Sequence, residues 1–201
     1  MFLEHPIIFA IMAGALILSI SIHEFAHALM ADKLGDPTPR INDRLTLNPK
    51  AHLDTMGTIS LLILGFGWGK PVPVDIYNLR NPKRDYALIS LAGPLSNIIL
   101  AIISIIVAKL IPIAAPIATL VAYFSIGLAV FNLIPIYPLD GQKILTGILP
   151  NDWAIEFEEI MHQYGSIILI FLIWPFSGQS LISRIIGPII DVVFEILTSI
   201  L

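Results

Sequence analysis

The sequence predicts an all-α polytopic membrane protein with about five to six membrane helices and a short re-entrant or β-like element after the first helix. Hydrophobic residues make up 56% of the 201 residues, charged residues only 13%, and the mean hydropathy is +0.86. Soluble domains average about 25% charged residues. Several apolar stretches approach or exceed the roughly 20 residues that cross a bilayer. We therefore expect one integral membrane domain over residues 1–201, with a core at 6–149 and C-terminal helices at 150–201.

The first membrane helix is expected at residues 6–31. It ends at the charged pair Asp32 and Lys33, and the following Gly35 suits the left-handed conformation of a helix C-cap. No basic segment or small-residue cleavage site frames this helix, so we expect it to be retained rather than removed as a signal peptide.

A polar stretch with three prolines, residues 36–54, leads to a short apolar run at 56–68. The run has 13 residues and three glycines, which favours a re-entrant or interfacial element over a full crossing. Residues 71–77 carry two prolines and are expected to be extended. They can pair only at a sheet edge, or form a plain loop at the membrane surface.

The remaining membrane segments are longer. A second span is expected at residues 86–110 and a third at 113–149, where Pro135 and Pro138 interrupt the helix because each proline removes a backbone donor. Acidic residues at 152–159 predict a loop before a fourth span.

That fourth span is expected at residues 160–176, and a last helix at 181–201. The last helix carries Arg184, Asp191 and Glu195 near one face. It can span with that stripe inward or lie in the interface, and we expect it to span.

The basic residues predict the orientation. Short cytoplasmic loops are enriched in Lys and Arg, and eight of the eleven basic residues lie between the first helix and the second span. We therefore expect this region to be cytoplasmic and the N-terminus of the multi-pass protein to lie outside. The eight residues are Lys33, Arg40, Arg44, Lys50, Lys70, Arg80, Lys83 and Arg84.

A His-Glu-x-x-His motif lies at residues 23–27, near the end of the first predicted helix. The four-residue spacing places the imidazoles of His23 and His27 on one helix face, where both can bind one zinc ion. Glu24 then stands beside the metal as a candidate general base. A chance match is disfavoured, because a charged residue at a membrane centre costs about 2.5 to 3.5 kcal/mol. The motif predicts a hydrolytic zinc site toward the cytoplasmic side.

Catalytic zinc usually takes three protein ligands and leaves one position for water. The clearest third ligand is Asp140, at the cytoplasmic end of the third span and thus at a depth similar to that of His23 and His27. We expect one Zn²⁺ per chain, bound by these three residues. The alternative for Asp140 is a carboxylate that caps the turn before Gly141.

Three further polar residues are candidates for the site. Asn97, in the second span, can stabilise an oxyanion or hold a substrate backbone, or form an interhelical hydrogen bond instead. Asn132 can hold substrate or satisfy carbonyls freed by Pro135. For His52, a structural role is favoured over gating or an accessory metal site.

Several separated segments together resemble the site-2 protease family of intramembrane zinc metalloproteases, in its compact bacterial and archaeal branch without PDZ or CBS domains. They cover about residues 19–145 and read HEFAHALMADKLGD, LTLNPKAHLDTMGT, GWGKPVPVDIYNLRNPKRD, ALISLAGPLSN and FNLIPIYPLDG. The resemblance implies zinc held by His23, His27 and Asp140, with Glu24 as the catalytic acid and base. It also implies an active-site role for Asn97 and Asn132.

These observations predict an intramembrane zinc endopeptidase that cleaves membrane-anchored proteins or remnant peptides. The alternative is a membrane metal transporter or metal-binding module. The net charge of −4 and the pI near 5.6 argue against a nucleic-acid partner. The absence of cysteine excludes disulfides and thiolate ligands. The expected partners are a membrane substrate and the bilayer, and assembly into a homo-oligomer is left open.

Overall fold

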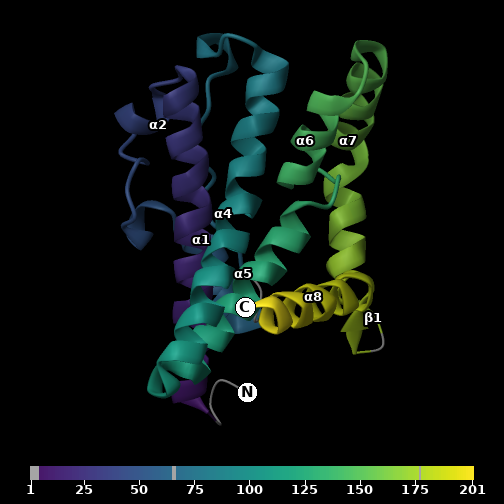
Figure 1. The fold of residues 1–201 in the computed structure, drawn as a ribbon. Coiled ribbons are helices and arrows are strands. Elements are labelled where there is room, and N and C mark those ends of the chain that lie inside the picture. Colours follow the sequence, from purple (N-terminus) through teal and green to yellow (C-terminus); the bar gives the residue numbers. More distant parts are fainter. Residues whose placement is uncertain (1–4, 65–66, 177) are drawn as a thin grey trace.

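The computed structural model describes residues 5–64, 67–176 and 178–201, and almost all regular structure in them is helical (Figure 1). Most of the long helices run side by side, the last one lies across them, and short helices and turns join them. In chain order the elements are α1 (Pro6–Leu34), α2 (Thr38–Ile41), η1 (Pro49–Ala51), α3 (Thr55–Leu64), η2 (Ile76–Asn78), α4 (Pro82–Leu110), η3 (Pro112–Ala114), α5 (Ala115–Asn132), α6 (Asp140–Ile148), α7 (Asn151–Ile173), β1 (Pro175–Phe176), β2 (Gln179–Ser180) and α8 (Leu181–Ile200).

Three of the described helices are long and apolar enough to cross a membrane: α1, α4 and the helical stretch Pro112–Asn132. By length and composition these are the helices of an integral membrane protein. The expected count of about five to six membrane helices is not confirmed. Besides these three, α7 and α8 are also long, but they carry more charged residues for their length. Whether those two helices also cross stays a prediction.

Small residues pack the three apolar helices against one another. Ala28, Ala101 and Ala122 are fully buried, and the hydroxyls of Ser19 on α1 and Ser125 on α5 lie 2.9 Å apart. Small side chains let helix backbones approach closely inside a membrane, where packing rather than water exclusion drives association. The α1, α4 and α5 bundle is therefore the frame on which the polar residues near its centre are held.

The end of α1 and the break in the third span agree with the sequence. Gly35 follows α1 with φ 106° and its N–H bonds the carbonyl of Ala31, as expected for a left-handed C-cap. Residues 133–139 separate α5 from α6, and Pro135 and Pro138 lie in that break. Asp140 thereby becomes the first residue of a new helix.

The loop expected at residues 152–159 is wrong. These residues belong to α7, which begins at Asn151 directly after Pro150 and runs without interruption to Ile173. Asp152 lies in the first turn of α7, where the helix dipole stabilises a carboxylate. The clustering of acidic residues therefore marks the start of this helix rather than a loop before it.

The regular structure described between α1 and α4 is helical, apart from one β-bridge. The apolar run at 56–68 forms α3 over its first part, and its residues 65 and 66 lie outside the described residues. Among the described residues of this segment, pairing consists of one antiparallel bridge between Leu53 and Gly69. The re-entrant path expected for this run stays a prediction.

Residues 69–75 have no helix or strand, apart from the bridge at Gly69, and we call them the covering segment. The extended conformation expected for 71–77 is present at Asp75 but not at Ile76 and Tyr77, because η2 begins at Ile76.

The last helix does not run parallel to the others. Figure 1 shows α8 lying across the bundle, next to the short β1–β2 hairpin. Ile190 of α8 packs into a core with Ala101 and Ile105 of α4 and with Ala122 and Ile126 of α5. The helix thus crosses α4 and α5 instead of running along them, and the expectation that 181–201 spans the membrane stays a prediction.

Candidate metal centre

Three ligand-type side chains meet where α1 passes the start of α6. Nε2 of His23 lies 3.1 Å from Oδ2 of Asp140, although the two residues are 117 positions apart in the sequence. Nε2 of His27 lies 3.2 Å from the same oxygen and 3.0 Å from Nε2 of His23. All three side chains are buried. The structure therefore brings together the ligand set that the sequence predicted.

The spacing of these atoms fits a small tetrahedral ion. Zinc–nitrogen and zinc–oxygen bonds of about 2.0 to 2.1 Å imply ligand atoms separated by about 3.3 Å along a tetrahedron edge. The three distances of 3.0, 3.1 and 3.2 Å form one such triangular face. Two imidazoles and one carboxylate are also a donor set that zinc favours in catalytic sites.

The outer nitrogens of both histidines have acceptors that fix the ring tautomers. Nδ1 of His27 donates to the carbonyl oxygen of Ile89, 2.7 Å away. Nδ1 of His23 lies 3.1 Å from Oδ1 of Asn97, whose amide nitrogen donates to the carbonyl of Ser19. With both protons on Nδ1, each Nε2 presents a lone pair toward the shared centre.

A glycine lets α4 come this close to the two rings. A Cβ at Gly93 would overlap ring atoms of His27 and lie 2.6 Å from Cε1 of His23. Any side chain at this position would push the imidazoles away from Asp140. Gly93 is thus part of the site although it has no polar group, and sequence reasoning did not single it out.

The Pro-containing break positions Asp140. A Cβ at Gly141 would overlap the carbonyl oxygens of Leu133 and Ile134, so the helix can start here only with glycine as its second residue. On the outer side, a Cβ at Gly165 of α7 would lie 2.8 Å from Cβ of Tyr137. The break is therefore packed tightly from both sides, which fixes the carboxylate at the start of α6.

Glu24 lies beside the ligands and faces the covering segment. Its Oε2 accepts a hydrogen bond of 3.1 Å from the backbone N–H of Val72. The cavity next to the three ligands has a volume of about 120 Å³. Besides the ligands and Glu24, its lining includes Pro71, Val72, Val74, Tyr86, Ile89, Ser90, Asn132, Pro138 and Lys143.

The covering segment is anchored at its far end by a buried carboxylate. Oδ2 of Asp36 accepts the N–H of Asp75 at 2.9 Å, and Oδ1 accepts the side-chain amide of Asn78 and both donors of Thr38. Burial acts to raise the pKa of Asp36, but these hydrogen bonds outweigh it and hold that pKa below its usual range. Asp36 is therefore a structural anion.

The other end of the covering segment, at Lys70, is held by the Arg44 side chain and by a backbone hydrogen bond. The guanidinium of Arg44 donates to the carbonyl of Lys70, and the N–H of Lys70 donates to the carbonyl of His52 at 2.7 Å. Burial lowers the pKa of Arg44, and the field of the Glu24 carboxylate acts against that shift. Nothing in the sequence alone connected Arg44 with the motif.

The other predicted residues fall in different places. Asn97 is fully buried behind His23 and does not line the cavity, so its contacts favour ligand orientation over contact with substrate. Asn132 lines the cavity and donates to the carbonyl of Leu128. His52 is fully buried, and its Nε2 bonds the carbonyl of Thr46. That contact agrees with the structural role favoured for His52.

Comparison with known proteins adds independent information. The sequence model of Peptidase family M50 matches residues 112–172. YwhC of Bacillus subtilis, named as a candidate zinc metalloprotease, is 35% identical over 94% of this chain and 96% of its own length. Rip2 of Mycobacterium tuberculosis carries the same description and is 31% identical over 69% of this chain. Stage IV sporulation protein FB of Bacillus subtilis is 30% identical over 65% of it.

The coverage differs among these relatives. The chain spans almost the whole of YwhC but only 57% of Rip2 and 47% of the sporulation protein. No solved structure gives a significant match.

Proposed function

The chain belongs to Peptidase family M50, the site-2 protease family, and on that premise we propose that it is an intramembrane zinc endopeptidase. Its substrates would be membrane-anchored proteins or remnant peptides, cleaved within or next to a transmembrane segment. The observation that carries the proposal is the buried triangle of His23, His27 and Asp140, with the Glu24 carboxylate beside it. A third ligand from a distant helix is what a hydrolytic zinc site requires.

In this proposal His23, His27 and Asp140 hold one Zn²⁺. When bound, the ion lowers the pKa of a coordinated water toward about 7 and polarises the peptide carbonyl. Glu24 accepts the proton of the attacking water and returns it to the leaving amine. Asn97 holds His23 in the tautomer that binds metal, and the amide of Asn132 contacts the substrate from the cavity wall.

The size of the cavity implies that the covering segment moves. A volume of about 120 Å³ accommodates an ion and a few waters, since each water occupies about 30 Å³ in the liquid. A peptide in extended form needs far more room. We therefore propose that substrate displaces the part of the covering segment around Val74 from the cavity, while the bond from Val72 to Glu24 is kept.

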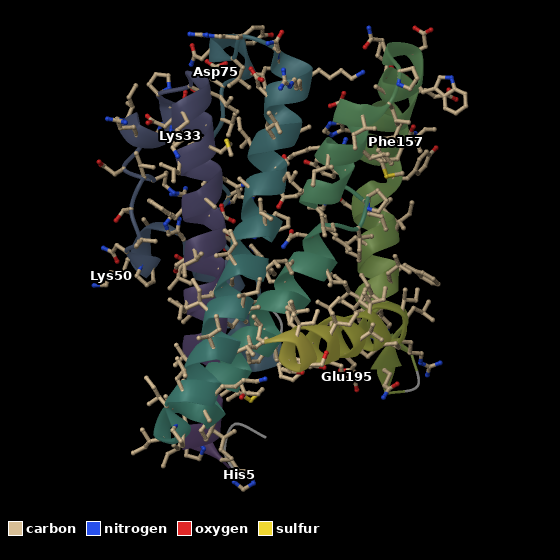
Figure 2. The ribbon with its side chains drawn as sticks, viewed as in Figure 1. His5, Lys33, Lys50, Asp75, Phe157 and Glu195 are labelled. Atoms are coloured by element: carbon tan, nitrogen blue, oxygen red, sulfur yellow. The ribbon has the colours of Figure 1, made fainter. Side chains whose placement is uncertain are left out.

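The membrane arrangement is proposed from the charge distribution. Figure 2 places His5 at one end of the bundle and Lys33 and Asp75 at the other. The Lys33 end would face the cytoplasm of a prokaryotic cell, with the metal centre toward that side. In the same proposal α3 is a re-entrant element, α7 and α8 complete the membrane domain, and the chain is one catalytic domain.

A comparison of membrane proteomes tests the proposal. Cells that carry Glu24→Gln in place of the native residue should accumulate one or more membrane-anchored proteins, and the matching soluble fragments should disappear. Glu24 also separates a protease from a metal transporter, because transport has no need of a base beside the ligands. Altered cellular zinc with an unchanged set of fragments would favour the transporter.

A further inference from the structure

We propose that Arg44 is a positioning residue for Glu24. In this view Arg44 fixes the path of the covering segment, so that the amide of Val72 holds the catalytic carboxylate beside the metal ligands. The inference rests on the proposed function, in which Glu24 is the general base.

A short chain of contacts links the two residues. The guanidinium of Arg44 donates to the carbonyl of Lys70, and two residues later the N–H of Val72 donates to Oε2 of Glu24 at 3.1 Å. Gly69 approaches Glu24 as well, since a Cβ there would lie 3.7 Å from Oε1. Arg44 thus fixes the covering segment at Lys70, and the same segment contacts the Glu24 carboxylate at Val72.

The burial of Arg44 requires an explanation that fold stability does not give. The residue is only 5% exposed, and a buried charge is costly unless it is paired. A guanidinium has five N–H donors, yet Nε of Arg44 has no partner among the described residues. An uncharged donor could bond the carbonyl of Lys70 at lower cost. The positive charge is therefore best explained by the carboxylate that its field reaches, which is Glu24.

Arg40 in the same loop shows how an arginine with a plain structural role is placed. Its guanidinium makes two hydrogen bonds to the carboxylate of Asp32, at 2.8 and 2.6 Å. Its side chain is 65% exposed. Arg40 is thus paired with a carboxylate and exposed to solvent, whereas Arg44 is buried and its Nε has no partner among the described residues.

Loss of the charge at position 44 should loosen the covering segment and let the Glu24 carboxylate leave its productive position. Misplacement of a reacting group by about 1 Å can cost about 100-fold in rate. Binding of an extended substrate depends on many other contacts, so KM should change little. The signature of a positioning role is thus a fall in kcat with KM and zinc content preserved.

The test compares Arg44→Gln, Arg44→Lys and the control Arg40→Gln in the full chain, reconstituted in nanodiscs. Hydrogen exchange of the Val72 amide is measured in zinc-free and zinc-loaded protein. Zinc content is measured by atomic emission, and kcat and KM on a membrane-anchored substrate. For Arg44→Gln we expect exchange at least about tenfold faster and kcat about 10- to 100-fold lower, with KM and zinc content unchanged. Arg44→Lys should recover part of kcat, and Arg40→Gln should match the native protein.

Unchanged Val72 exchange in Arg44→Gln would overturn the inference. So would a native kcat, a rise in KM alone, or a loss of zinc in both Arg44 variants. Faster exchange in a chain whose native form cleaves no membrane substrate would instead refute the proposed function, while the contact from Arg44 to the covering segment would stand.

Discussion

Oδ1 of Asn97 lies 3.1 Å from Nδ1 of His23, while Nε2 of the same ring faces the carboxylate of Asp140. The amide nitrogen of Asn97 donates to the carbonyl of Ser19, which leaves its oxygen as the acceptor for the imidazole proton. One buried amide on α4 thus decides which nitrogen of His23 is available to a metal. This contact connects the packing of α1 against α4 with the chemistry of the site.

Replacing Asn97 with Ala should weaken zinc binding by about 10- to 100-fold, because outer partners of ligating histidines have effects of that size. Chelator competition on the purified protein measures the change. Asn132→Ala is the matched comparison, since Asn132 lines the cavity without contacting a histidine, and it should keep native zinc affinity. Equal affinities for both variants would show that Asn97 does not orient His23.

Gly93→Ala should remove zinc and destabilise the protein by about 1 to 3 kcal/mol, because the added methyl overlaps the ring of His27. Zinc content and thermal unfolding in detergent measure both effects. Gly187→Ala, where a Cβ meets nothing within 4 Å, should keep zinc and be at least as stable as the native chain. A zinc-replete Gly93→Ala protein would mean that α4 does not constrain the ligands.

The buried carboxylate of Asp36 predicts a pH dependence of stability. Its folded pKa is lowered, so its contribution is complete above the unfolded value of about 3.9 and is lost as the pH falls below that value toward the folded pKa. Asp36→Asn should therefore lower the free energy of unfolding by about 1 to 3 kcal/mol at pH 7. The difference in unfolding free energy between this variant and the native protein should become smaller as the pH falls below about 4.

Thermal unfolding between pH 3 and pH 7 checks this expectation. The control is Asp43→Asn, because Asp43 is exposed and has a positive φ of 54° that asparagine also tolerates. It should match the native chain at every pH. A stability difference between Asp36→Asn and the native protein that grows on acidification would contradict the lowered pKa of Asp36.

The chain contains no cysteine, so single cysteines can report its orientation. A cysteine at Lys33 should react with a membrane-impermeant maleimide only after the cells are opened. A cysteine at His5, at the opposite end of the bundle (Figure 2), should react in intact cells. The reverse pattern would place the metal centre toward the outer face.

The sequence predicted those features that depend on local pattern. Apolar length located α1, histidine spacing located two of the three clustered side chains, and Pro135 and Pro138 located the break before Asp140. Each of these signals depends on residues close together in the chain, where helix periodicity and backbone donors decide the outcome.

Features that depend on tertiary packing could not be predicted from the sequence. The role of Gly93 exists only because α4 crosses α1 at the two imidazoles. The link from Arg44 to Glu24 passes through a backbone segment that is far from both residues in the chain. The early start of α7 was missed for a different reason, because acidic residues that stabilise a helix terminus have the same composition as a loop.

The most direct measurement of the central claim is made on purified Glu24→Gln in nanodiscs. Zinc content and cleavage of a membrane-anchored substrate are determined on the same sample. The account predicts about one zinc per chain, as in the native protein, and cleavage reduced by about 100- to 10,000-fold, because the proton acceptor is lost while the ligands remain. Cleavage at the native rate by a zinc-loaded Glu24→Gln protein would contradict it.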